Sequence, residues 1–399
     1  MKATYYLIFL LLTSNIILGQ KYLNYSNDSL KINSTFLKET ITLNLHLPET
    51  YRYAAATTKY PITIIFDSQH QRVYPQIIHS IDLLTSESQM PETIIIGIPF
   101  NRNNRHYLTS NQKIKGDILS GIERMEKFLF EELLPLLKKQ YRTNDFTIVT
   151  GHSRSAFLVN YLITKRSHQI NTAIALSGFF SNKPLSIQQF KAYISDEYNF
   201  PHLVNYYFSA GTTTEENTYL TEDTDLSNYL TNHKTATNFK GHFFETKNTN
   251  HMTNYWVSFP PFLMDCFSDY NLILDNWFYH KLKGKTITNP IEEFKSDLKN
   301  VSIKLGFKVN PNLTHLFSLA SHYGYEKKDY NTAINFLKLG QKYYPDYPDF
   351  ELDFIEYYKL LNNSQMVDFH KQQYTNKILS RKDISNADKE KLLQNLIKE

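Results

Sequence analysis

The segment that most constrains the fold of this chain is residues 146–162, a short strand that turns sharply into a helix. It begins with Phe-Thr-Ile-Val-Thr, a β-branched and aromatic composition typical of an inner strand, and ends in an apolar helical run. The bend between them contains Gly151, Ser153 and Ser155. A serine at such a bend has a strained backbone, so the residues two before and two after it must be small. The segment predicts a nucleophile elbow at Ser153. The alternative is an ordinary Gly/Ser-rich turn into a helix, which has a similar sequence.

Several apolar runs of strand length recur along the chain, separated by helical segments. Runs of this kind are typical of parallel strands that helices cover on both faces. A run at residues 41–47 alternates strictly between apolar and polar side chains, which predicts an edge or antiparallel strand with one exposed face. We therefore expect an α/β fold with a mainly parallel central sheet flanked by helices. The apolar runs are residues 60–66, 93–99, 172–178 and 205–211, and the helical segments include residues 75–86 and 121–141.

Residues 1–20 have the composition of an export signal. A single Lys2 precedes a short apolar run, and small or polar residues follow it, as in a secretory signal peptide. A buried N-terminal helix is the alternative. The run is short for a membrane span, which needs about 20 residues, and no other stretch approaches that length. We expect an exported protein, periplasmic or extracellular, with no membrane span in the mature chain.

Cysteine content and charge exclude other classes of protein. Cys266 is the only cysteine, so no internal disulfide can form and stability must come from packing. The net charge of +4 is small for 399 residues, and the basic residues are dispersed. We therefore expect no nucleic-acid partner. A chain of this length can bury a large core in roughly two or three domains.

Candidate catalytic side chains follow the predicted strands in an informative order. Ser153 follows one strand, Glu215 and Glu216 follow the run that ends at Gly211, and His251 lies in a loop after a further strand. Ligands of an open parallel sheet bind beyond the carboxyl ends of its strands, so these side chains can converge there. The order serine, acid, histidine is that of α/β-hydrolase triads. The alternatives are a surface histidine and two glutamates that only cap the following helix.

Further segments, in a fixed order, carry a family resemblance. They are residues 64–69, ending in Asp-Ser-Gln; residues 94–98; residues 131–143, with Glu-Glu-Leu-Leu-Pro-Leu and Gln-Tyr-Arg-Thr; Gly151-His152-Ser153; and Asn250-His251. Together they resemble the putative esterase branch of the α/β-hydrolases, which includes esterase D, feruloyl esterases and enterochelin-type siderophore esterases. The likeness spans roughly residues 30–275.

The chain departs from this family's pattern at three places. Ser155 and Ala156 stand where the family has Gly-Gly, and residues 106–110 read His-Tyr-Leu-Thr-Ser in place of Arg-Asp-Leu-Thr-Pro. The family's Gly-x-x-acid motif is stretched, so that Gly211 is followed only later by the two glutamates. These departures concern the elbow, the substrate contacts and the identity of the acid.

The resemblance implies transfer of an acyl group to water. Ser153 would attack an ester carbonyl, and His251 would act first as general base and then as general acid. Glu216 or Glu215 would hold the imidazole and stabilise its charged form. The substrate would be a small-molecule ester, and the reaction would require no metal and no cofactor.

The resemblance places the oxyanion hole at two backbone N–H groups. One belongs to Arg154, next to the nucleophile, and the other to Ser68 or Gln69 in the loop after the first inner strand. We expect Asp67 to hold this loop without a direct chemical role. Arg105 is expected on a solvated loop face, with binding of an anionic substrate group as the alternative.

Beyond residue 279 inner strands disappear and charged helical segments follow. Residues 313–345 have the spacing of one tetratricopeptide repeat of about 34 residues. A helical pair at residues 350–374 and a last helix at residues 387–397 would complete a small helical unit, because a single repeat cannot bury its own apolar face. An irregular helical extension packed on the first domain is the alternative. A repeat groove would offer a site for a peptide or protein partner.

The sequence thus predicts a signal peptide at residues 1–20, an α/β-hydrolase esterase domain at residues 21–280 and a tetratricopeptide-like helical domain at residues 281–399. The predicted function is that of an exported serine esterase with a Ser-His-Glu mechanism. The competing hypothesis is a hydrolase-like binding protein that has lost activity through the altered elbow and whose helical part recruits a partner.

Overall fold

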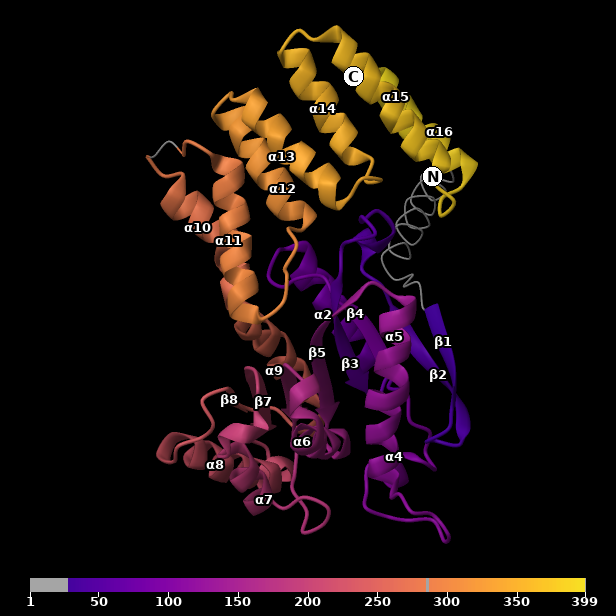
Figure 1. Ribbon diagram of the computed structural model, residues 1–399, viewed down its shortest axis with the longest axis vertical. Coiled ribbons are helices and arrows are strands. Elements are labelled where there is room, and N and C mark those ends of the chain that lie inside the picture. The colour runs from indigo at the N-terminus through magenta and orange to yellow at the C-terminus, as the bar shows by residue number, and fades with distance from the viewer. Residues whose placement is uncertain (1–27, 285–286, 399) are drawn as a thin grey trace, which may run out of the picture.

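The computed structural model describes residues 28–284 and 287–398 of the chain (Figure 1). The signal peptide predicted at residues 1–20 lies outside the described residues. Within the described ranges, no helix has the length and apolar character needed to cross a membrane.

The centre of the described chain is an eight-stranded sheet with the order β1-β2-β4-β3-β5-β6-β7-β8. The strands are β1 (Asp28–Ser34), β2 (Glu39–His46), β3 (Tyr60–Phe66), β4 (Ile94–Ile98), β5 (Thr143–His152), β6 (Thr172–Leu176), β7 (Val204–Gly211) and β8 (Phe239–Thr246). All neighbours from β4 to β8 in this order are parallel, whereas β2 is antiparallel to both β1 and β4. The predicted α/β fold with a mainly parallel sheet is confirmed, and the alternating run at residues 41–47 belongs to the antiparallel β2.

Helices follow the strands and cover both faces of this sheet. They are η1 (Glu49–Arg52), α2 (Val73–Ser86), α3 (Arg105–Leu108), α4 (Gly121–Lys127), η2 (Phe128–Leu133), α5 (Leu134–Gln140), α6 (Arg154–Arg166), η3 (Ser167–Gln169), α7 (Ile187–Ile194), η4 (Glu197–Asn199), η5 (Thr214–Glu216), α8 (Asn217–Asn232), α9 (His251–Cys266), α10 (Ser268–Asn276) and η6 (Trp277–Lys281). The helical segment predicted at residues 121–141 is present as α4, η2 and α5 in succession.

Alternating side chains of the inner strands supply two apolar cores, one on each face of the sheet. On β3, Ile64 joins the core formed with α4, α5 and α6, whereas the next residue, Ile65, joins the core formed with α2 and α9. Both side chains are fully buried. Because successive side chains of a strand point to opposite faces, strands buried on both faces must be apolar throughout. This explains the continuous apolar runs in the sequence.

The C-terminal part of the chain is entirely helical within the described residues and forms one end of the molecule, coloured orange to yellow in Figure 1. Its helices are α11 (Pro290–Leu305), α12 (Leu313–Ser321), η7 (His322–Glu326), α13 (Tyr330–Tyr343), α14 (Asp349–Leu360), α15 (Ser364–Ser380) and α16 (Asn386–Lys398). Successive helices α12 to α15 pack against each other along the chain. The core on the α2 and α9 face of the sheet continues without a break into these helices.

Candidate active site

Ser153 lies at the sharp bend between β5 and α6. Its φ of 58° and ψ of −120° place it in a backbone conformation that residues with a side chain rarely adopt. The bend is held by a hydrogen bond of 2.8 Å from the Ser153 N–H to the Leu176 carbonyl at the end of β6. A Cβ atom at Gly151 would lie 2.2 Å from the Ser155 carbonyl oxygen, so only glycine fits this position of the strand. The local geometry is that of an elbow.

Ser155 fits at the position where the family has glycine, because its side chain points to a polar partner. The residue is fully buried, and its hydroxyl donates a hydrogen bond of 2.6 Å to Oδ2 of Asp67. Asp67 follows β3 and has a positive φ of 61°. The substituted serine therefore ties the start of the elbow helix to the start of the loop after β3.

Asp67 is the centre of a small charged network. Arg105 binds it with two hydrogen bonds of 2.6 and 2.7 Å, and the side-chain amide of Gln69 donates a third, of 2.9 Å. Burial acts to raise the pKa of Asp67, but the bonds and charge of Arg105 and the bonds from Ser155 and Gln69 outweigh burial and hold this pKa below its usual value. The expectation of a solvated Arg105 is wrong, because its guanidinium is paired with the carboxylate that anchors the loop.

His251 and Glu216 meet beyond the ends of β7 and β8. Nδ1 of His251 lies 2.5 Å from Oε1 of Glu216, whose side chain is fully buried. Glu215 contacts the same residue differently, since its carboxylate accepts a bond of 3.0 Å from the His251 backbone N–H. Of the two acids left open by the sequence, Glu216 is the one within hydrogen-bond distance of the imidazole.

Three donors hold the Glu216 carboxylate in its charged form. Besides His251, the Ser177 hydroxyl donates a bond of 2.6 Å and the Gly211 N–H a bond of 2.9 Å to Oε2. Burial acts to raise the pKa of Glu216, but these hydrogen bonds outweigh burial and keep the pKa below its usual value. Asn254 donates in turn to the Ser177 hydroxyl at 2.7 Å. The acid is thereby fixed in position and charge.

Two aromatic rings pack against the imidazole of His251. Tyr219 stacks on it with ring centroids 4.8 Å apart, and the His152 ring is tilted against it with centroids 4.5 Å apart. His152 donates from Nε2 to the His251 carbonyl at 2.7 Å. Burial and the nearby His251 lower the pKa of His152 to about 4, so His152 is a neutral hydrogen-bond donor near neutral pH.

The two loop residues expected to supply an oxyanion donor differ in what their N–H groups contact. The Ser68 N–H donates to the Ile98 carbonyl at 3.2 Å, whereas the Gln69 N–H has no acceptor in the described part of the chain. The Arg154 N–H is the first of helix α6, where backbone donors lack an acceptor within the helix. The Gln69 side chain is held by Asp67 and by the Phe100 N–H, which donates to its oxygen at 2.8 Å.

Ser153 and His251 both line one cleft with a volume of about 350 Å³. Asp67, Gln69 and Arg105 form part of its wall. In residues 28–284 and 287–398, no group of three His, Cys, Asp or Glu side chains is arranged to hold a metal ion. The cleft thus combines a hydroxyl, an imidazole paired with a carboxylate, and backbone donors, which are the groups that acyl transfer requires.

Three contributors to this site were not singled out from the sequence. Ser177 and Asn254 support Glu216, and Tyr219 stacks on His251. The small residues at the end of the run 172–178 were the only signal for Ser177. Asn254 and Tyr219 lie on helices whose polar residues give no indication of which side chain faces the site.

The sheet order, the antiparallel β2 and the elbow between β5 and α6 define the class of protein as an α/β-hydrolase. A family model described as Putative esterase matches residues 34–257. The chain belongs to that family and is a hydrolase that acts on esters. A search of the curated proteins found no match.

Solved structures share the fold at low sequence identity. An uncharacterised protein from Capnocytophaga ochracea is 15% identical with a TM-score of 0.59, over 93% of this chain and 99% of its own. An IroE-like serine hydrolase from Shewanella oneidensis is 17% identical with a TM-score of 0.60, over 80% of this chain and 99% of its own. The BES protein from Bacillus cereus is 16% identical with a TM-score of 0.52, over 60% of this chain and 96% of its own. At such identities the likeness supports the fold alone.

Proposed function

We propose that this protein hydrolyses a carboxylic ester through an acyl-enzyme intermediate on Ser153. The observation that carries the proposal is the contact of 2.5 Å between His251 Nδ1 and the buried Glu216, at the cleft that Ser153 also lines. A buried carboxylate on Nδ1 leaves Nε2 of the imidazole free to accept a proton from a serine hydroxyl. The strained backbone of Ser153 at the bend between β5 and α6 also supports the proposal, because the nucleophile of an α/β-hydrolase has this conformation.

The proposed reaction has two halves. The Ser153 hydroxyl oxygen attacks the ester carbonyl carbon and passes its proton to Nε2 of His251, while Glu216 stabilises the resulting imidazolium. The N–H groups of Arg154 and Gln69 donate to the oxyanion. His251 then protonates the alcohol oxygen as its bond to the acyl carbon breaks, which leaves the acyl group on Ser153. In the second half His251 takes a proton from water, which attacks the acyl carbon, and passes that proton to the Ser153 oxygen as the acid is released.

The proposal is tested with p-nitrophenyl acetate and a fluorophosphonate probe. We expect turnover by the wild-type protein, covalent labelling by the probe, and a loss of at least about a thousandfold in kcat in Ser153→Ala together with loss of labelling. Absence of turnover and labelling in the wild type would contradict the proposal and favour a hydrolase-like binding protein.

We propose a domain boundary near residue 280, with the remaining residues forming a tetratricopeptide-like unit. The packed helix pairs α12–α13 and α14–α15 support this proposal. Export directed by residues 1–20 also remains a prediction, which N-terminal sequencing of the secreted or periplasmic protein would test.

A further inference from the structure

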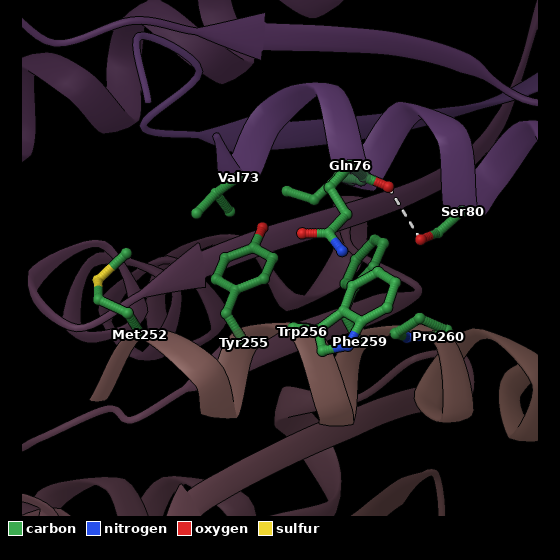
Figure 2. Close-up of a pocket in the computed structure, with 9 residues that line it drawn as sticks. Val73, Gln76, Ser80, Met252, Tyr255, Trp256, Phe259 and Pro260 are labelled. Atoms are coloured by element: carbon green, nitrogen blue, oxygen red, sulfur yellow. Dashed lines mark hydrogen bonds between the residues drawn. The ribbon is translucent and has the colours of Figure 1, made fainter. Parts of the chain in front are cut away.

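A narrow groove extends the cleft between helices α2 and α9 (Figure 2). Val73, Ile77, Met252 and Tyr255 line both the groove and the cleft that contains Ser153 and His251. Helix α2 follows the loop with Gln69, and α9 begins at His251. The groove is therefore continuous with the proposed site and is built from elements that also carry its residues.

Most of the side chains that line the groove are apolar. Beyond the shared residues it is lined by Trp256, Phe259 and Pro260, and Figure 2 shows these side chains facing α2. The Ser80 hydroxyl is bonded to the Gln76 carbonyl at 2.9 Å. The polar groups that the walls leave for a ligand are the amide of Gln76 and the hydroxyl of Tyr255, which has no hydrogen-bond partner in the described part of the chain.

The size of the groove limits what it can hold. Its volume is about 40 Å³, which is room for roughly three water-sized groups. Trp256 is 50% exposed and Met252 is 40% exposed, although both are large apolar side chains. A mainly apolar groove that continues a cleft with a few convergent polar groups is typical of ligand-binding sites. The dimensions suit the end of a narrow chain better than a ring.

We propose that this groove binds the terminal carbon atoms of an aliphatic chain of the substrate, so that the preferred substrates are esters with a medium-length aliphatic group. The inference rests on the proposed ester hydrolysis at Ser153. Each methylene group that leaves water for an apolar wall strengthens binding about fourfold. A chain long enough to pass Tyr255 and reach Trp256 gains this effect, whereas an acetyl or ethyl group does not.

The test uses two series of esters, because the chain can belong to the acid or to the alcohol. One series keeps the p-nitrophenyl group and varies the acid from acetate through butyrate and hexanoate to octanoate. The other keeps acetate and varies the alcohol from ethanol to octanol. We expect kcat/KM to rise at least tenfold with chain length in one of the series, which identifies the side of the ester that enters the groove.

Two variants change the groove and one matched control does not. Ser80→Phe places a ring in the groove, and Trp256→Ala removes part of its wall. Val257→Ala is the control, because Val257 is a neighbouring, 38% exposed residue of α9 that does not line the groove. We expect the long-chain to short-chain ratio of kcat/KM to fall about tenfold in Ser80→Phe, to fall several-fold in Trp256→Ala, and to stay unchanged in Val257→Ala.

The outcomes separate this inference from the proposed function. A flat chain-length profile with Ser153-dependent hydrolysis of acetate would overturn the subsite and leave the esterase proposal intact. A chain-length preference that survives in both groove variants, each folded by circular dichroism, would also overturn it. No turnover of any ester and no labelling of Ser153 would overturn both.

Discussion

At the residue scale, Ser155 shows how an altered motif can keep its geometry. The glycine at this position of the family's motif leaves room between helix and strand, and here Ser155 occupies that room with its hydroxyl bonded to Asp67. Asp67 also holds Arg105 and Gln69. The substitution thus adds a hydrogen bond between the elbow and the loop that contains the proposed oxyanion donor at Gln69.

This contact leads to a prediction for Ser155→Ala and Ser155→Gly. Both remove a hydrogen bond to a largely buried carboxylate, so we expect the free energy of unfolding to fall by about 1–3 kcal/mol. We also expect a lower kcat with little change in KM, because the loop with Gln69 loses an anchor. Urea denaturation and p-nitrophenyl acetate kinetics measure both effects. If Ser155→Gly, which restores the family's motif, is as stable and active as the wild type, the hydroxyl has no such role.

The two adjacent glutamates provide a matched pair for the second prediction. Glu216→Gln should lower kcat by about a hundredfold to ten-thousandfold, because the amide cannot stabilise the His251 imidazolium. Glu215→Gln should change kcat less than about fivefold, since Glu215 bonds to the backbone N–H of His251, whereas the imidazole bonds to Glu216. Steady-state kinetics of both variants decide the assignment. Equal losses in the two variants would contradict it.

At the element scale, the start of helix α12 joins the helical region to the end of α2. Asn312 caps α12 by accepting a bond of 3.0 Å from the His315 N–H, and its amide also donates to the Thr85 carbonyl at 2.8 Å. The Ser88 hydroxyl donates to Asn312 at 2.9 Å. The buried Asn312 side chain therefore caps the N-terminus of α12 and also connects this helix by hydrogen bonds to the sheet-containing part of the chain.

The third prediction compares this cap with an exposed cap of the same residue type. Asn312→Ala should lower the free energy of unfolding by about 2–4 kcal/mol, since it loses the cap and leaves buried partners unsatisfied. Asn363→Ala should cost only about 1 kcal/mol, because the exposed Asn363 only caps α15. Thermal and urea denaturation provide the comparison. Equal effects would show that the contact with α2 adds no stability.

At the scale of the whole molecule, one core runs from the sheet into the C-terminal helices. His315 of α12 lies within it, fully buried between the rings of Tyr270 and Phe294. Burial lowers the pKa of His315 to about 3, compared with 6.5 for an ordinary histidine. The helical region therefore contains a neutral histidine that resists protonation only while the protein is folded.

The fourth prediction follows from this difference. Between pH 6.5 and about 3 the unfolded chain binds a proton at His315 and the folded chain does not. Proton binding stabilises the unfolded chain, so the free energy of unfolding is highest above pH 6.5 and decreases as the pH falls towards 3. Between pH 6 and 4 we expect the free energy of unfolding to fall less steeply in His315→Gln than in the wild type. The two slopes should differ by about 1.4 kcal/mol per pH unit. Urea denaturation across this range measures the slopes. Parallel curves would refute the role of His315.

Local patterns in the sequence determined the central architecture of this protein. Apolar runs such as residues 60–66 predict strands buried on both faces, because each successive side chain of a strand must find an apolar neighbour. Motif order and family resemblance led to Ser153, His251 and the pair Glu215 and Glu216 as candidates, since the carboxyl ends of parallel strands meet at one edge of the sheet.

Contacts between distant segments depended on the tertiary structure, because they join side chains that local patterns do not relate. The pairing of His251 with Glu216 rather than Glu215 depends on how the turn after Gly211 directs two adjacent carboxylates. The bond from Ser155 to Asp67 spans 88 positions and has no periodic signal. The continuous core beneath the C-terminal helices likewise arises only when both parts of the chain bury their apolar faces together.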